Sequence, residues 1–359
     1  MGGAHDSTTG RRYRRARRLR AEDRGVVAVI GTLLALLVFF ALFGIFLTQY
    51  VPLWMTDNES LFTAQAATSF AQFKGAVDSQ YFLDGPQSYG TPFTISSAGV
   101  PLIAQPTQGT LDFLPSTCPG GFFSKTSNPV GHAGNVTGEY GQPVNPSYCV
   151  FANVTESVGP GGSLGYSQSI PTGTLEFLLP NRYYTPETFY YEDDAVIQSQ
   201  SSGYQLMAFP PPLNVSVVGA NTTVSDTLLQ LYGNASTVVG QGSSEVYSAL
   251  RFSQFVTSNG AGSPFSFTFE IGTQYPCAWS PYLYSILKAS GLPSVGYSLQ
   301  HWFQKTESIP LSATFPGSPS SCFNVNGATT ILSFTISSVS YAQLYLAGVQ
   351  VSLGVGSVT

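Results

Sequence analysis

Charge is what this sequence has least of. Only 9% of its 359 residues are Asp, Glu, Lys or Arg, against about 25% in an average soluble domain. Aromatic residues reach 13%, which excludes an ordinary disordered chain, because such chains are rich in charge and poor in aromatics. The net charge of −5 argues against a nucleic-acid-binding protein.

Metal-binding and catalytic motifs are also missing. Three His and four Cys are too few and too scattered for most metal sites, and no C-x-x-C pair indicates zinc or redox chemistry. The chain has no H-E-x-x-H or P-loop motif, and the Gly-rich stretch at 159–165, which contains a G-x-S-x-G match, is interpreted as a flexible loop. We therefore expect no enzyme activity, no cofactor and no bound metal.

The few charges are divided by position. Residues 1–25 carry eight Arg and three acids, a net +5, and the rest of the chain carries −10. Val26–Leu47 then contains 22 residues without a charge. As a helix this run would be about 33 Å long, enough for a bilayer core of about 30 Å. The sequence therefore predicts a single membrane-spanning helix in contact with lipid.

The Arg cluster before the span predicts its orientation. By the positive-inside rule the N-terminus lies in the cytoplasm and everything after about residue 55 lies outside the cell. A buried core helix is the first alternative, but such helices rarely run this long without a polar face. A cleaved secretory signal is the second, but its apolar region is shorter and no A-x-A site directly follows the apolar run here.

The junction before the span carries a family resemblance. The sequence Glu22-Asp23-Arg24-Gly25-Val26 resembles the class III signal of archaeal type IV pilins and archaellins. That resemblance implies that a prepilin-type peptidase cuts between Gly25 and Val26 and leaves the apolar helix on the mature protein. Glycine suits such a position because its backbone can extend into a protease cleft. The leader, at 25 residues, is long and Arg-rich for this family.

A second helix is expected directly after the span. Thr56 and Glu59 have capping-box spacing, and Asp84-Gly85-Pro86 predicts the end of the helix. One apolar face recurs every three or four residues, at Phe62, Ala66, Phe70, Phe73, Val77 and Tyr81. Pro52 predicts a kink between span and stalk. We expect a leader at 1–25, a transmembrane or assembly helix at 26–54, an amphipathic stalk helix at 56–84 and a head at 90–359.

The sequence predicts that the head is a mainly antiparallel, sandwich-like β structure. It forms either one domain or two subdomains near 90–240 and 241–359. Period-2 alternation predicts strands at 91–96, 110–114, 174–179, 213–218, 265–271, 332–336 and 349–353. Asn326-Gly327 predicts a hairpin turn. Helices are expected at 280–289, ended by Gly291, and at 244–257. The fold class is therefore α+β and membrane-anchored.

The head adds to the resemblance through residues 189–197, Phe-Tyr-Tyr-Glu-Asp-Asp-Ala-Val-Ile. This stretch resembles a Tyr-Glu-x-x-Ala-Val-Ile hairpin of archaeal pilin-like surface proteins, and the resemblance is best over about residues 22–220. Glu192-Asp193-Asp194 is also the densest acid cluster. It suits either a Ca²⁺ site or a two-residue hairpin turn at Asp193-Asp194, and the turn is favoured.

Two kinds of modification are expected outside the cell, where disulfides persist. Four cysteines allow three pairings, and we favour Cys118–Cys149 and Cys277–Cys322 because these close the shorter loops, each contributing roughly 3–4 kcal/mol. Six N-x-S/T sequons are glycosylation candidates, at Asn58, Asn135, Asn153, Asn214, Asn221 and Asn234.

Together these features predict a structural protein of the cell surface. The expected function is that of a pilin-like subunit, or minor pilin, that assembles with like subunits through its apolar helix and displays a β head for adhesion. The alternative is a permanently anchored adhesin or receptor without a filament. With so few surface charges, we also expect little loss of stability at low pH, and an acidic habitat follows as a hypothesis.

Overall fold

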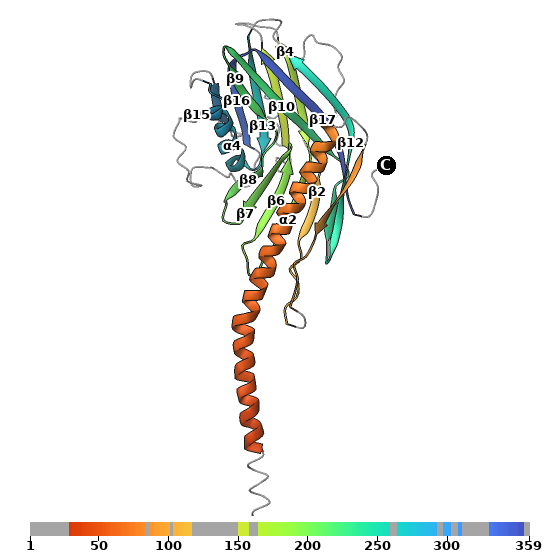
Figure 1. The fold of residues 1–359 in the computed structure, drawn as a ribbon, viewed down its shortest axis with the longest axis vertical. Helices are drawn as coiled ribbons and strands as arrows, with labels where there is room; N and C mark the ends of the chain where they lie inside the picture. The colour runs from red at the N-terminus through yellow and green to blue at the C-terminus, as the bar shows by residue number, and fades with distance from the viewer. Residues whose placement is uncertain are drawn as a thin grey trace, which may run out of the picture.

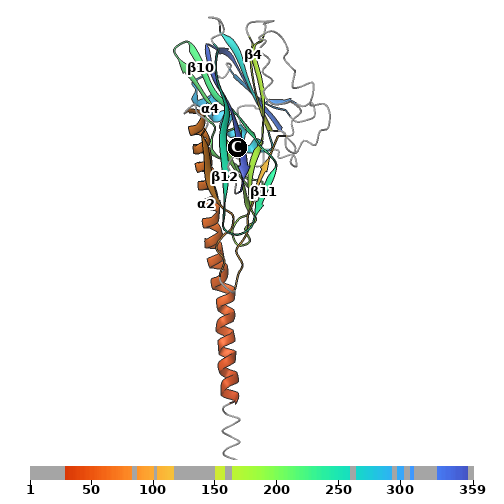
Figure 2. The ribbon, with the colours of Figure 1, turned by 90° about the vertical axis from the view of Figure 1, so that its right-hand side faces the viewer.

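The computed structural model describes residues 29–82, 87–100, 103–116, 150–157, 164–258, 264–292, 297–302, 308–310 and 330–354. Figure 1 shows a long helix that leaves a β-rich head at one end, and Figure 2 shows the upper half of that helix lying along one side of the head. The predicted order of an apolar helix followed by a mainly antiparallel β domain is confirmed.

The expectation of a second, separate helix beginning at Thr56 is wrong. One helix runs from Val29 to Phe82, 54 residues, and comprises residues 29–45, the π turn η1 (Phe46–Tyr50) and α2 (Val51–Phe82). The backbone N–H of Val51 donates to the carbonyl of Phe46, and this wider turn lies directly before Pro52, which has no N–H to donate.

Thr56 does not cap a new helix. Its hydroxyl donates to the Pro52 carbonyl, four residues back in the same helix, at 2.9 Å. The Thr56 hydroxyl is engaged within the helix, and the apolar helix and the amphipathic helix form one continuous helix. Packing against the head begins near Val51 and Met55, which are 5% and 1% exposed.

The head consists of three sheets. The first has strand order β1 (Ser88–Thr94), β12 (Ser243–Ser258), β17 (Tyr341–Leu353), β10 (Asn221–Tyr232) and β9 (Asn214–Val218). The second has β11 (Ser236–Val239), β2 (Thr110–Leu114), β5 (Thr174–Leu179), β6 (Glu187–Glu192), β7 (Ala195–Gln200) and β8 (Gln205–Phe209). The third has β15 (Ser308–Pro310), β14 (Tyr297–Trp302), β16 (Thr330–Val339), β13 (Phe265–Thr273), β3 (Val150–Ser157) and β4 (Leu164–Thr172).

Strand pairing within these sheets is antiparallel except between β10 and β17, which run parallel over ten residue pairs. Strands from both sides of residue 240 share the first and the third sheet. The long β10 and β17 pair therefore forms the centre of the head, and sequence-distant segments meet on its two faces.

Two hydrophobic cores lie on either side of this centre. The first fills the space between α2, the first sheet and the second sheet, with Phe70, Phe93, Phe177 and Tyr191 among its buried rings. The second lies among the first sheet, the third sheet and helix α4 (Pro276–Ala289), around Trp279. The β6–β7 hairpin contributes side chains to both cores, so it joins them.

Local predictions succeeded where turns or alternation were strong. Strands β2 and β5 match the expected ranges at both ends, and Gly291 follows helix α4 with a φ of +78°. The helix expected at 244–257 is wrong: this segment is β12, which is held between β1 and β17. Helix α4 begins at Pro276 rather than at Ser280, and Asn326-Gly327 lies outside the described residues.

Candidate functional site

The lower part of the long helix is an apolar surface with nothing packed on it. Side chains from Val29 to Phe43 are all exposed, and the most apolar 18-residue window has a mean hydropathy of 2.8 with none of it buried. Among the described residues this is the one helix long and apolar enough to cross a membrane. Its surface is of the kind that lipid or other apolar helices cover.

The junction between helix and head is held by a carboxylate. Glu59 is 0% exposed, and its Oε2 accepts hydrogen bonds from the backbone N–H groups of Tyr183 and Tyr184 at 2.7 and 2.8 Å. The N–H of Arg182 lies 3.0 Å from the same oxygen, and the Thr107 hydroxyl donates to Oε1 at 2.5 Å. These contacts attach two head loops to the helix.

The electrostatics of Glu59 follow from these donors. Burial by itself would raise the pKa of Glu59, but the hydrogen bonds from Thr107 and from the three backbone N–H groups outweigh it and lower the pKa below its usual value. Glu59 is therefore an ionised anchor at the base of the head.

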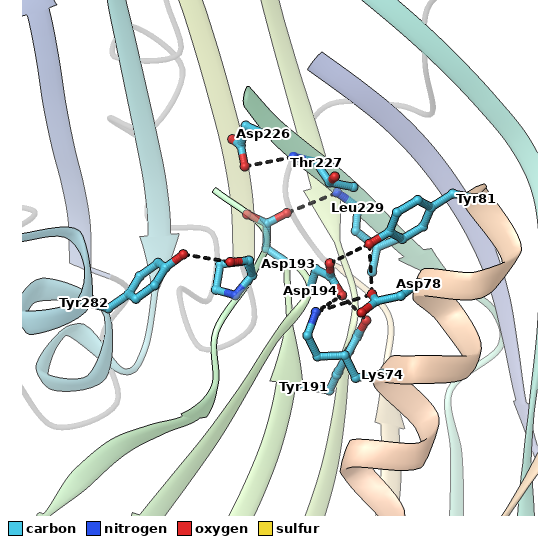
Figure 3. Close-up of polar contacts among 11 residues, drawn as sticks. Lys74, Asp78, Tyr81, Tyr191, Asp193, Asp194, Asp226, Thr227, Leu229 and Tyr282 are labelled. Atoms are coloured by element: carbon cyan, nitrogen blue, oxygen red, sulfur yellow. Dashed lines mark hydrogen bonds and ion pairs between the residues drawn. The ribbon is translucent and has the colours of Figure 1, made fainter. Parts of the chain in front are cut away.

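A second group of polar side chains surrounds the tip of the β6–β7 hairpin, where Figure 3 shows residues of α2, β10 and α4 converging. The turn residues Asp193 and Asp194 have positive φ angles of 42° and 61°, as a type I′ turn requires. The predicted two-residue hairpin is confirmed. Asp is tolerated here because its short polar side chain can hydrogen-bond locally, which lets its backbone adopt the left-handed region.

The hairpin tip is tied to the long helix by Asp194. The Lys74 ammonium lies 2.8 Å from Asp194 Oδ1 and 3.3 Å from Asp78 Oδ1. The Tyr191 hydroxyl donates to Asp194 Oδ1 at 2.7 Å, and the Tyr81 hydroxyl lies 3.1 Å from Oδ2. Burial raises the pKa of Asp194 to about 7, while Lys74 acts to lower it. Asp194 therefore joins β6 and α2.

Glu192 ties the same hairpin to the second core. Its Oε1 accepts a hydrogen bond from Trp279 Nε1 at 2.7 Å and one from the Thr273 hydroxyl. Burial raises the pKa of Glu192 to about 7, although both hydrogen bonds act to lower it. The other oxygen, Oε2, is buried without a hydrogen-bond partner.

Two more acids lie at the tip (Figure 3). Asp193 belongs to the hairpin turn, and Asp226 belongs to β10. Asp193 Oδ1 accepts the Leu229 N–H at 3.2 Å, and Asp226 Oδ1 accepts the Thr227 N–H at 2.9 Å. Burial and then the charge of Asp226 raise the pKa of Asp193 well above its usual value, and burial raises that of Asp226 to about 7.

The carboxyl groups at this tip have separate partners. Glu192 reaches α4 and β13, Asp193 reaches β10, and Asp194 reaches α2. Within the described part of the chain, no group of three His, Cys, Asp or Glu residues is placed to hold a metal ion. The two-residue turn accounts for the Asp193-Asp194 pair in this cluster.

Other sequence-predicted residues are distributed as follows. The processing residues Arg24, Gly25 and Val26 lie outside the described residues, as do Cys118, Cys149, Cys322 and Asn135. Cys277 is half-buried at the start of α4. Among the residues described no disulfide is present, and the favoured pairings stay predictions.

The remaining sequons differ in accessibility. The Asn58 amide donates to the Ala98 carbonyl at 3.0 Å, so the nitrogen that a glycan would need is engaged. Asn214, Asn221 and Asn234 are exposed at strand ends or in a loop, and Asn153 lies in β3. The three exposed positions are better glycosylation candidates than Asn58.

Sequence reasoning did not identify Lys74, Asp78 and Asp226 as site residues. It placed Glu59 in a capping box and missed its contacts with the head. Lys74 and Asp78 were visible as an oppositely charged pair four residues apart in a helix with few charges. Asp226 was visible as an acid inside a run of strand residues. Neither pattern identified the partner across the fold.

Comparison with known proteins does not extend this description, since no family model, curated protein or solved structure matches the chain.

Proposed function

We propose that this protein is a pilin-like structural subunit of a cell-surface filament. The observation that carries the proposal is the 54-residue helix, whose first half is apolar and exposed on all sides while its second half is packed on a β head. A helix of this kind can be held in a bilayer and then move into a filament core, because contacts with like helices replace contacts with lipid.

The head would form the outer surface of the filament. Glu59 attaches the helix to the head at the level where packing begins, so a pull on the helix is passed to the sheets. Low surface charge favours close packing of like subunits, because little charge must be desolvated. The proposed role of the head is adhesion, and the mechanism requires no catalysis.

Processing separates this function from permanent anchoring. We expect N-terminal sequencing and intact mass of the native protein to give a mature start at Val26 with the apolar helix retained. A Gly25→Leu variant should keep its leader and form no filaments by electron microscopy, while Gly10→Leu, a matched change within the leader, should be processed normally. A native start at Met1 or Gly2 would refute filament assembly and favour an anchored adhesin.

A further inference from the structure

The hairpin tip buries more negative charge than positive. Glu192, Asp193, Asp194 and Asp226 are each no more than 4% exposed. Within the described residues the one ion pair to any of them is Lys74–Asp194. Lys74 also serves Asp78. Among these five carboxyl groups, the described ammonium therefore pairs with Asp194 and Asp78 and leaves Glu192, Asp193 and Asp226 without an ion pair, and burying an unpaired carboxylate is strongly unfavourable.

Hydrogen bonding does not replace the missing cations. Asp226 Oδ2 and Glu192 Oε2 are buried with no hydrogen-bond partner, although a carboxylate requires donors at both oxygens. Glu59 provides the contrast within the same protein, because each of its oxygens accepts backbone or hydroxyl donors. The hairpin acids lack the surroundings of an ionised group.

The groups that face these acids from the neighbouring elements do not supply the charge either. Helix α2 contributes Asp78 and Tyr81 besides Lys74, and β6 contributes Tyr190 and Tyr191. Tyr275, next to α4, and Tyr282, within it, also face this cluster, and Glu176 on β5 adds a further acid beside Tyr190 and Tyr275. These tyrosines are neutral hydroxyl groups whose pKa burial raises further.

We propose that the hairpin tip is a proton-dependent lock, in which Glu192, Asp193 and Asp226 are neutral carboxylic acids in the folded head. The lock joins α2, β10 and α4, because the hairpin contacts all three. Folding then takes up protons, so the head is most firmly closed in acid and loosens as the pH rises through neutrality. This inference does not depend on filament assembly.

The direction of the effect follows from linkage. The pKa of Glu192 and that of Asp226 are raised to about 7 by burial, and burial with the charge of Asp226 raises that of Asp193 well above its usual value. Below their unfolded values, about 4, both states are protonated and the stability is fully present. Between about pH 4 and 7 these groups are ionised in the unfolded chain but still protonated in the folded head. For each such group the unfolding constant therefore rises about tenfold for every unit that the pH rises, and stability falls.

The test is urea unfolding of the full chain in detergent from pH 4 to 8.5, followed by tryptophan fluorescence. Trp279 is a suitable reporter because its indole donates to Glu192. We expect the unfolding constant to rise steeply between pH 5 and 7 in the native chain. Asp226→Asn removes one titrating group, so the unfolding constant of this variant should rise by about a factor of ten less for each pH unit. Asp57→Asn, at an exposed position of α2, should leave the rise unchanged.

A second measurement does not depend on variants that fold. The infrared carbonyl stretch of protonated carboxyl groups should be present in the folded native chain at pH 6 and disappear on unfolding at the same pH. An unfolding constant that is flat or falls between pH 5 and 7 would overturn the proposal. So would an infrared spectrum at pH 6 without protonated carboxyl groups in the folded chain.

Discussion

Replacing Glu59 should separate the long helix from the base of the head. In Glu59→Ala the N–H groups of Arg182, Tyr183 and Tyr184 lose the carboxylate that accepts them at 2.7 to 3.0 Å. Leaving such donors buried and unpaired costs about 1–3 kcal/mol for each group, reduced here because the loop can move toward water. Summed over the donors that lose Glu59, we expect a loss of about 4 kcal/mol in unfolding free energy.

Glu59→Gln is the more discriminating change, since it keeps the shape and removes the charge. One side-chain oxygen remains as an acceptor, and the hydroxyl of Thr107 can turn to accept from the new amide. The expected loss is about 2 kcal/mol, the difference between charge-assisted and neutral hydrogen bonds summed over these contacts. Asp57→Asn, two residues earlier and exposed, should change the unfolding free energy by less than about 0.5 kcal/mol.

The assay is urea unfolding of the full chain in detergent, with hydrogen exchange of the loop at residues 182–184. Both Glu59 variants should exchange faster in this loop than the native chain. Because the pKa of Glu59 is lowered in the folded state, its contribution is present above about pH 4.5 and is lost as the pH falls below that value. A Gln variant as stable as Asp57→Asn at pH 6 would refute the anchoring role of Glu59.

Two further pairs of substitutions test the packing. Phe70→Ala should cost about 3–5 kcal/mol of unfolding free energy, because the fully buried ring of Phe70 packs against two other rings. Phe82, on the same helix, is 68% exposed, and Phe82→Ala should cost under about 1 kcal/mol. Equal losses would refute the core assignment. Gly233→Ala should cost about 1–3 kcal/mol, because a Cβ there would lie 2.2 Å from the Val351 carbonyl oxygen. Gly75 lies in open space on α2, so Gly75→Ala should stabilise the protein by about 0.5–1 kcal/mol. Chemical unfolding measures all four variants. A Gly233→Ala protein as stable as Gly75→Ala would contradict the close approach of Gly233 to Val351.

Glu59 and the hairpin acids act in opposite directions on the pH scale. Stability from Glu59 is lost in strong acid, and stability from Glu192, Asp193 and Asp226 is lost toward neutral pH. We therefore expect a stability maximum in mild acid. The sequence-based expectation that little stability is lost at low pH considered the surface charges alone. The buried acids make the head more stable in mild acid than at neutral pH.

Local sequence signals predicted the elements that do not depend on distant partners. Strand alternation located β2 and β5, and Asp193-Asp194 identified a two-residue turn. The segment 244–257 failed because its place between β1 and β17 decides its conformation. Thr56 failed as a cap because the preceding helix was already formed and continued through it.

The sequence by itself determined that a basic segment precedes a long uncharged helix, that an amphipathic face follows, and that the head is β-rich. These properties depend on composition and short-range periodicity, which a sequence displays directly. Tertiary structure alone decided that Glu59 meets Tyr183 and Tyr184, and that Asp194 meets Lys74. Those pairs are more than a hundred residues apart, and only the fold determines which buried charges find partners.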